Sequence, residues 1–344
     1  MMRRIAKLPA LALAAATMTC GLVLAGAASA EPVTWRFNNN YAPTRPESEH
    51  IRNFAKDVEA RSGGELKITV IEGGGMNLKD ADALRWMQTG TPEIAFIWPT
   101  FIGRDAPDLA SLYVYGSVST AEEHLKALPA VKGALKEGFE ERGIPVVGYM
   151  ALPIIDASLF CREPVKTLDE LKTKKVRVGS REQVETFTAL GVAAQIIPQN
   201  ELYSALQTGV VDCALYAARF AKSVSLQEVA KHAVYTGFPF PPVPYAIVAN
   251  KGSLDKLTDA QRKALDEAGV ALEAASSDFS KDTAAEKTAR AALAEAGVTY
   301  YADFSDADKE AIRAAAAKTW EKLTTEAGDK AVAHRAAISD LLKK

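Results

Sequence analysis

The sequence is poor in the residues from which metal sites and hydrolytic active sites are built. It has three cysteines and four histidines among 344 residues, and their spacing matches no metal-binding pattern. It contains no G-x-S-x-G, no H-E-x-x-H and no Walker loop. We therefore expect no resident metal ion and no cofactor, although the sequence leaves open whether a metal assists ligand binding. Nothing in the sequence supports an enzyme.

The few histidines are interpreted as surface residues. All four lie in segments predicted to be helical and have charged neighbours: His50, His124, His232 and His334. The glycine run 73–75 follows a strand signal but lacks the spacing and the downstream acidic residue of a nucleotide site, so it is interpreted as a turn.

A concentrated basic segment is also missing. The chain carries 41 Lys and Arg against 43 Asp and Glu, which gives a net charge of −2. Tight binding to nucleic acid depends on clustered positive side chains that neutralise phosphates. We therefore expect no nucleic-acid partner.

Only one long hydrophobic run is present, and it lies at the N-terminus. Three positive residues, Arg3, Arg4 and Lys7, precede the apolar run 8–24, and Ala28-Ser29-Ala30 follows it. This order is typical of a secretory signal peptide cleaved after Ala30. A membrane anchor would need positive stop-transfer residues, whereas the next residues are Glu31-Pro32. We expect export to the periplasm, and removal of three positive charges leaves a mature net charge of −5.

Two cysteines remain after cleavage, Cys161 and Cys213. An oxidising compartment allows them to form a disulfide. The sequence does not show whether their Cα atoms come close enough, so both states stay open.

The rest of the chain alternates strand and helix signals. Strands are predicted at 33–38, 66–71, 94–98, 146–150, 157–161, 175–178, 195–197 and 213–216. Between them, helical periodicity predicts helices around 51–58, 81–88, 119–142 and after Ser180. The pattern Thr44-x-x-Glu47 predicts a capping box for the first helix. Strands separated by helices indicate an α/β fold with parallel sheets covered on both faces.

An internal similarity suggests two halves of like topology. Residues 88–98, QTGTPEIAFIW, match residues 207–217, QTGVVDCALYA, in the Gln-Thr-Gly start, the acidic residue and one alanine. Each segment predicts a helix end, a glycine stop and a buried strand. Any helix–glycine–strand junction could look alike, so this alternative stays open. The last third differs, because 258–296 predicts one long helix or two in line, and 305–344 a further helical block.

The segment Val176-Arg177-Val178-Gly179-Ser180 is the strongest local candidate for a binding site. Ligands of parallel α/β sheets bind at the carboxyl ends of strands. There, the helix start at Ser180 offers free N–H groups, and the planar guanidinium of Arg177 matches a carboxylate. The pattern therefore predicts a carboxylate clamp. On these residues alone, an Arg paired with a surface acid is an equal alternative.

These residues also belong to a longer resemblance. KKVRVGS at 174–180, followed by FTALGVAAQIIPQNELYSALQTGVVD at 187–212, resembles the solute-binding proteins of tripartite ATP-independent periplasmic (TRAP) transporters of the DctP type. FAKDVEARSGGELKITVIEGGG at 54–75 and LRWMQTGTPEIAF at 84–96 are similar to the first lobe of that family. The resemblance runs from about residue 33 to the end.

The resemblance implies a two-lobed periplasmic binding protein fold with a long inter-lobe helix. After the signal peptide at 1–30, it implies a first lobe at 31–152 plus about 240–275 and a second lobe at 153–239 plus about 276–344. It further implies that an Arg at the position of Arg177 pairs with a ligand carboxylate. The implied partners are a small organic acid and a membrane permease with a large and a small subunit.

Departures from the family pattern guide the expected ligand. The family often has Gly-Phe-Arg where this chain has Ile154-Ile155-Asp156-Ala157-Ser158, and Gly-Gln-Glu-Asn where it has Cys213-Ala214-Leu215-Tyr216. Several residues are expected near the cleft together with Arg177 and Ser180: Asn40, Trp98, Tyr216, Arg219 and Phe238. One strong Arg with aromatic walls favours a monocarboxylate with an apolar or aromatic body over a sugar acid. An ABC-type or a sensory periplasmic binding protein for a carboxylate remains the alternative.

Overall fold

The computed structural model describes residues 32–343, with the side chain of Asn200 excepted. The predicted signal peptide and its cleavage site after Ala30 lie outside the described residues. From Pro32 on, the chain forms one compact unit. Within this part, no helix combines the length and the apolar character needed to cross a bilayer.

The first of two sheets has five strands in the order β2-β1-β3-β10-β4. We refer to the part of the chain built on it as the first lobe. Strand β1 pairs in parallel with both β2 and β3, whereas β10 runs antiparallel to β3 and to β4. The strands are β1 (Val33–Asn38), β2 (Leu66–Ile71), β3 (Ile94–Ile97), β4 (Val146–Met150) and β10 (Tyr245–Ala249).

The second sheet has six strands in the order β11-β9-β5-β8-β6-β7 and defines the second lobe. Strand β6 is parallel to β7 and β8, whereas β5 is antiparallel to β8 and β9. The strands are β5 (Asp156–Cys161), β6 (Lys175–Val178), β7 (Ala193–Ile196), β8 (Cys213–Ala217), β9 (His232–Pro239) and β11 (Thr299–Tyr300). The α/β class is confirmed, but the prediction of parallel sheets is wrong for both.

The antiparallel strands follow from how the chain passes between the lobes. After β4 it crosses to the second lobe through 151–155, so β5 starts at the junction and runs away from it. It returns between β9 and β10, so β10 likewise starts at the junction. Strands that begin where their neighbours end must pair antiparallel. Neither β9 nor β10 was among the predicted strands.

The helices flank both sheets. In the first lobe they are α1 (Pro46–Arg61), α2 (Ala83–Thr89), α3 (Pro107–Ala110), α4 (Ala121–Glu141), α10 (Lys251–Leu254) and α11 (Asp259–Ser276). In the second lobe they are α5 (Leu168–Leu171), α6 (Arg181–Ala189), α7 (Leu202–Gln207), α8 (Ala218–Ala221), α9 (Leu226–Val229) and α12 (Asp282–Glu295). The chain ends with α13 (Asp306–Ala327) and α14 (Asp329–Leu342).

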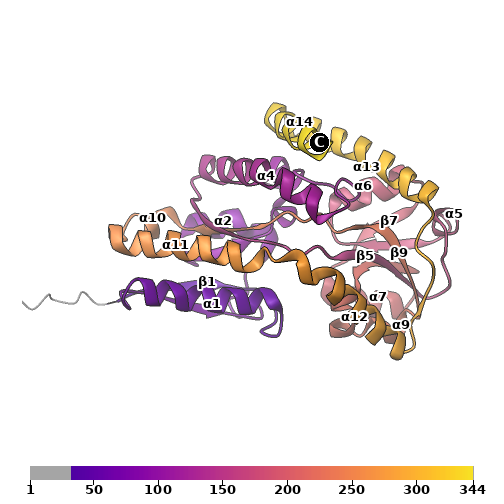
Figure 1. Cartoon of the computed structure of the whole chain (residues 1–344), viewed down its shortest axis with the longest axis horizontal. Coiled ribbons are helices and arrows are strands. Elements are labelled where there is room, and N and C mark those ends of the chain that lie inside the picture. The colour runs from indigo at the N-terminus through magenta and orange to yellow at the C-terminus, as the bar shows by residue number, and fades with distance from the viewer. Residues whose placement is uncertain (1–31, 344) are drawn as a thin grey trace, which may run out of the picture. The chain divides into compact units, whose positions relative to one another are not determined.

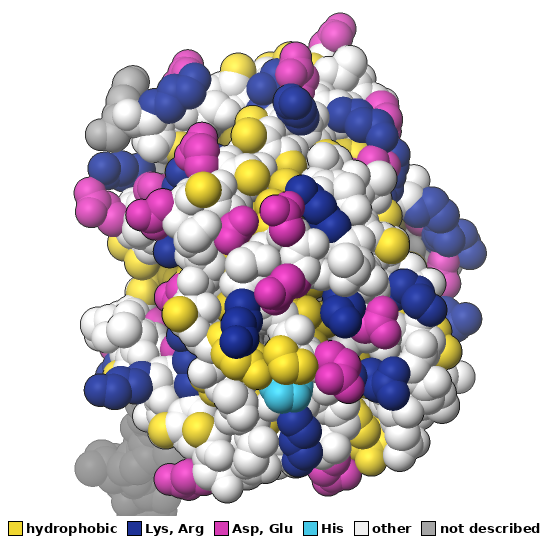
Figure 2. All heavy atoms as spheres, turned by 90° about the vertical axis from the view of Figure 1, so that its right-hand side faces the viewer, with side chains coloured by type: hydrophobic (Ala, Val, Ile, Leu, Met, Phe, Trp, Pro, Cys, Tyr) yellow, Lys and Arg dark blue, Asp and Glu magenta, His cyan; other side chains and the backbone are white. Residues whose placement is uncertain are grey.

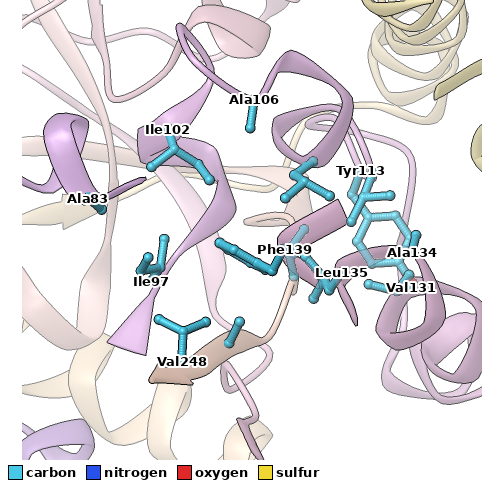
Figure 3. Packing of buried hydrophobic residues seen from close by; sticks show 14 of the residues in the cluster. Ala83, Ile97, Ile102, Ala106, Tyr113, Val131, Ala134, Leu135, Phe139 and Val248 are labelled. Atoms are coloured by element: carbon cyan, nitrogen blue, oxygen red, sulfur yellow. The ribbon is translucent and has the colours of Figure 1, made fainter. Parts of the chain in front are cut away.

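Strand β3 shows why its sequence is apolar throughout. Its residues alternate between two cores on opposite faces of the first sheet. Ala95 and Ile97 face the core that α4 covers, while Ile94 and Phe96 face the core under α1 and α11. Figure 3 shows the first of these cores, where Phe139 of α4 points toward Ile97 and Val248 of the sheet. The prediction of a strand buried on both faces is confirmed.

The two similar segments of the sequence occupy equivalent places. Gly90 ends α2 before β3, and Gly209 follows α7 before β8; both glycines have positive φ, 82° and 74°. Strand β8 also alternates between two cores, because Cys213 and Leu215 face one of them and Tyr216 the other. Each segment thus supplies a central strand of its lobe.

The long C-terminal helical region is broken into separate helices. Helix α11 lies beside α1 on the first lobe, and after a break at 277–281 the chain continues as α12 along the second lobe (Figure 1). The structure has two separate helices in place of one long helix, and Figure 1 shows that the chain bends between them. Helix α13 packs on α6 and α14 packs on α4. The predicted lobe boundaries at about 240, 275 and 276 stay a prediction.

The disulfide alternative and the capping box predicted for the first helix are both decided by the structure. Cys161 and Cys213 lie directly opposite each other on β5 and β8 and form a disulfide. The capping box predicted at α1 is absent, because Arg45 is the N-cap residue and makes no side-chain cap; Glu47 pairs with Arg45 instead.

The surface interpretation of the histidines is wrong for His124. It lies on α4 as expected but is fully buried, with its Nδ1 3.3 Å from the Tyr113 hydroxyl. Burial lowers the pKa of His124 to about 4, so this side chain is uncharged at neutral pH. The predicted location of His232 is also wrong, because this residue lies in β9 and not in a helix.

Charged side chains of both signs alternate over the outer face of the second lobe. Figure 2 shows this face, where Lys and Arg are interspersed with Asp and Glu. Such a surface produces no large field of one sign.

Candidate functional site

A cavity of about 610 Å³ lies between the two lobes, where strands from both sheets end. The first lobe contributes Asn40, Tyr41, Arg45, Asp80, Trp98, Phe101 and Tyr245, and the second lobe contributes Arg177, Ser180, Gln183, Tyr216 and Phe220 among others. The crossing segments add Leu152, Ile155 and Phe240. Its volume falls in the range typical of sites for small molecules.

Arg177 is a buried cation without a counter-ion. It lies on β6 and is only 6% exposed. Its Nε donates to the Ile197 carbonyl over 2.8 Å, and one Nη lies 3.4 Å from the Leu215 carbonyl. Among the described residues, no Asp or Glu comes within ion-pair distance of it. Burial lowers the pKa of Arg177, and an anion in the cavity would offset this cost.

Ser180 lines the same cavity but is already engaged. It is the N-cap of α6, as predicted, although its side chain does not cap the helix. Its hydroxyl donates to Glu182 over 2.8 Å, and the Gly179 N–H donates to Gln183 over 2.9 Å. Glu182 is fully buried, and this burial raises its pKa to about 7. The helix start is therefore partly occupied by its own side chains, which leaves Arg177 as the main anchor.

Aromatic rings form much of the cavity wall. Trp98 packs edge-on against Phe101 with ring centroids 5.0 Å apart, and its indole N–H donates to the Val243 carbonyl over 3.1 Å. The Tyr216 ring lies 5.8 Å from the Arg177 guanidinium. Its buried hydroxyl has no hydrogen-bond partner among the described residues. Within residues 32–343, the wall thus offers apolar surface beside Arg177, a cation without an acidic partner.

A second arginine in the cavity was missed by the sequence analysis. Arg45 lies between the rings of Tyr41 and Phe220, 4.0 and 4.3 Å from their centroids, and pairs with Glu47. Because Glu47 balances its charge, Arg45 does not add a free positive charge to the site. The sequence held one signal for Arg45: it lies in a polar loop after β1, and ligands of α/β sheets bind at the carboxyl ends of strands.

Asn40 lines the cavity together with Asp80, which the sequence analysis did not single out. The Asn40 amide donates to the Leu78 carbonyl over 3.0 Å and to the Asp80 carboxylate over 2.6 Å. The sequence before Asp80 shows neither helical nor strand periodicity. Its position beside Asn40 therefore follows from the fold and could not be predicted from the sequence.

Two expected contacts do not line this cavity. Arg219 points from α8 toward α12, where it pairs with Asp282 over 3.0 Å, and its neighbour Phe220 faces the cavity instead. Successive residues of a helix point in different directions, and the sequence does not show which one faces inward. Phe238 is buried in the core beside Tyr115 and Phe187. The structure therefore brings together Asn40, Trp98, Arg177, Ser180 and Tyr216, but not these two residues.

Comparisons with known proteins agree with this architecture. Residues 37–326 match the family described as bacterial extracellular solute-binding protein, family 7, or DctP. A solute-binding protein of Albidiferax ferrireducens is 31% identical over 230 residues, which cover 65% of this chain and 66% of that protein.

Solved structures show the same fold at lower identity. DctP7 of Bordetella pertussis, a solute receptor that binds pyroglutamic acid, superposes with a TM-score of 0.79 at 21% identity, over 91% of this chain and 100% of that one. A TRAP periplasmic solute-binding protein of Roseobacter denitrificans with bound β-D-glucuronate gives a TM-score of 0.76 at 23% identity, over 90% and 99% of the chains. The chain belongs to the DctP family of extracellular solute-binding proteins, which are transport proteins and not enzymes.

Proposed function

We propose that this protein captures a small organic monocarboxylate with an apolar or aromatic body in the periplasm and delivers it to a TRAP membrane permease. The observation that carries the proposal is the guanidinium of Arg177, which is buried at the cavity wall without an acidic partner among the described residues. A ligand carboxylate would supply the missing negative charge and accept two parallel hydrogen bonds.

The remaining wall supports an apolar body. Trp98, Phe101 and Phe220 offer flat hydrophobic surface, and Leu152 and Ile155 of the crossing segment add aliphatic surface. Polyhydroxylated acids need many hydrogen-bonding partners, because each buried hydroxyl without one costs free energy. The two solved relatives bind organic acids of both kinds, pyroglutamic acid and glucuronate. The aromatic wall favours the less hydroxylated kind for this chain.

Capture would proceed by closure of the two lobes over the acid, since both lobes line the cavity. Delivery to a permease with a large and a small subunit follows from the family's place in TRAP transport. A sensory role in which the liganded protein contacts a receptor is the second candidate, since it would use the same capture step. Binding of the liganded protein to membranes that carry the permease would distinguish the two.

The first experiment measures thermal shifts of the mature protein with a panel of organic acids. A ligand that binds only the folded state raises the melting temperature. We expect at least one monocarboxylate to stabilise the wild type and Arg177→Ala to lose the shift. Lys175→Ala removes an exposed cation from the same strand and is the matched control. Equal shifts in Arg177→Ala, or binding confined to sugar acids, would contradict the proposal.

A further inference from the structure

A second cavity lies between the two lobes, and we call it the rear cavity. Its volume is about 470 Å³. The start of α4 forms its first-lobe wall, and α12 forms its second-lobe wall. Its lining residues include Ser119, Thr120 and Ala121 of the first wall and Asp282, Thr283 and Glu286 of the second. Among the described residues, none lines both the rear cavity and the cavity around Arg177, so the two cavities are separate.

The segments that cross between the lobes lie between these two cavities. In the crossing 151–155, Leu152 and Ile155 line the cavity around Arg177, whereas Ile154 lines the rear cavity. The crossing 240–244 contributes Phe240 to the cavity around Arg177, and the crossing 277–281 contributes Phe279 to the rear cavity. The crossings therefore form a layer with one cavity on each side. Since they join the lobes covalently, they are where a hinge motion pivots.

Helix α12 is fixed to the part of the second lobe that faces the ligand. Asp282 of α12 accepts hydrogen bonds from the Ile154 N–H over 2.8 Å and from Arg219 of α8 over 3.0 Å. Helices α8 and α12 also pack against each other. Phe220, the residue after Arg219, lines the cavity around Arg177. A movement of Phe220 relative to the first lobe therefore carries α12 with it.

The first-lobe wall of the rear cavity is also held rigidly. The Thr120 side chain caps α4 by accepting from the Glu123 N–H over 3.1 Å, and the apolar face of α4 belongs to the core of the first lobe. When two rigid bodies rotate about a layer between two cavities, one cavity narrows as the other widens. The rear cavity therefore widens as the lobes close over a ligand and narrows as they open.

We propose that the rear cavity sets the equilibrium between the open and closed lobes, so that the side chains lining it determine ligand affinity without touching the ligand. Atoms that fill this cavity keep α12 from approaching α4, and this disfavours the open state. A shift of the equilibrium toward the closed state tightens the binding of any ligand that prefers that state. The inference rests on the proposed function only in taking the cavity around Arg177 as the ligand site.

The test adds bulk to the rear cavity from each wall in turn. Thr283→Phe enlarges a side chain of α12, and Ala121→Phe enlarges one at the start of α4. Thr288→Phe is the matched control, because Thr288 is exposed on α12 and lines neither cavity. Isothermal titration calorimetry with benzoate, mandelate and pyroglutamate gives the dissociation constants. Small-angle X-ray scattering gives the radius of gyration of each ligand-free protein, and its thermal melting shows that it is folded.

We expect both bulky variants to bind an acid that the wild type binds at least about threefold more tightly, mainly through slower dissociation. Their ligand-free radii of gyration should be smaller than that of the wild type, and Thr288→Phe should match the wild type in both measurements.

Tighter binding is required in both variants, since local repacking alone would change only one of them. Unchanged or weaker binding in either folded variant would overturn this inference and leave the proposed function standing. Failure of all these acids to bind the wild type would count against the proposed function. The radii of gyration would then decide the inference, and wild-type values in both bulky variants would overturn it.

Discussion

The guanidinium of Arg45 lies 4.3 Å from the ring centroid of Phe220, although the two residues belong to different lobes. Arg45 precedes α1 of the first lobe, and Phe220 lies on α8 of the second. Tyr41 covers the other side of the guanidinium at 4.0 Å. The contact joins the two lobes beside the cavity, so it stabilises the arrangement in which they lie close together.

Replacement of Phe220 by Leu should therefore weaken ligand binding. Leucine keeps apolar bulk but removes the ring, and a partly buried cation–π contact stabilises by about 1 kcal/mol. We expect the dissociation constant of the acid found in the thermal-shift screen to rise roughly fivefold, measured by calorimetry. Phe220→Tyr keeps the ring and is the control. An unchanged affinity in Phe220→Leu would show that this contact does not favour closure.

Much of the fold could be predicted because hydrophobic periodicity is a local property. The strands β1, β2, β4 and β6 have the predicted bounds, and β3 is apolar because both faces of its sheet are covered. Strand direction is not local. The antiparallel placement of β5 and β10 depends on the two crossings between lobes, and no residue pattern within either strand encodes them.

The site was predictable to the extent that it follows a strand end. Arg177 on β6 and Trp98 after β3 lie at carboxyl ends, and both line the cavity. Arg219 and Phe238 also lie near strand ends, yet neighbouring residues face the cavity instead. Which side chain of a short helix or a strand end points inward depends on packing against distant elements, here α12 and the core around Phe187.

Helix α11 approaches β4 so closely that each element has a glycine at the contact, Gly269 on α11 and Gly148 on β4. A Cβ on Gly269 would lie 2.2 Å from the Val147 carbonyl oxygen, which is backbone and cannot move aside alone. Gly269→Ala should lower the free energy of unfolding by about 3 kcal/mol, as overpacking does in a close-packed core. Urea unfolding measures this change. Val270→Ala on the same helix is the control, because Val270 is 71% exposed, and it should stay near the wild type.

The disulfide between Cys161 and Cys213 should contribute measurably to stability. It joins β5 to β8 across a sequence separation of 52 residues, and cross-links of this kind stabilise by about 2–4 kcal/mol. The double variant Cys161→Ala/Cys213→Ala should melt roughly 5–10 °C below the oxidised wild type. A reducing agent should lower the melting temperature of the wild type and leave that of the variant unchanged. Two free thiols in the unfolded, unreduced wild type would contradict the bond.

Glu286 provides a prediction about pH. Its carboxylate is 4% exposed, and neither oxygen has a hydrogen-bond partner among the described residues. The nearest cation is Arg219, 3.6 Å away, which Asp282 also engages. Burial and the nearby Asp156 raise the pKa of Glu286 to about 8. Arg290 and Tyr300 face the same group.

The direction of the effect follows from proton linkage. Between the ordinary pKa of a glutamate and about 8, the folded state holds a proton on Glu286 that the unfolded state lacks. The stabilisation that this proton gives the folded state is fully present below the pKa of Glu286 in the unfolded chain. It is lost as pH rises through about 8, the pKa of Glu286 in the folded protein. The slope is at most about 1.4 kcal/mol per pH unit. Glu286→Gln mimics the protonated form, so it should remove this loss.

Urea unfolding between pH 6 and 9, chosen as roughly two units below and one above that pKa, tests the prediction. The wild type should lose stability relative to Glu286→Gln across this range, with the difference levelling off above the folded pKa. Glu295→Gln, an exposed position on the same helix, should follow the wild type at every pH. Parallel curves for the wild type and Glu286→Gln would mean that Glu286 is ionised in the folded protein throughout, and that Arg219 then compensates both Asp282 and Glu286.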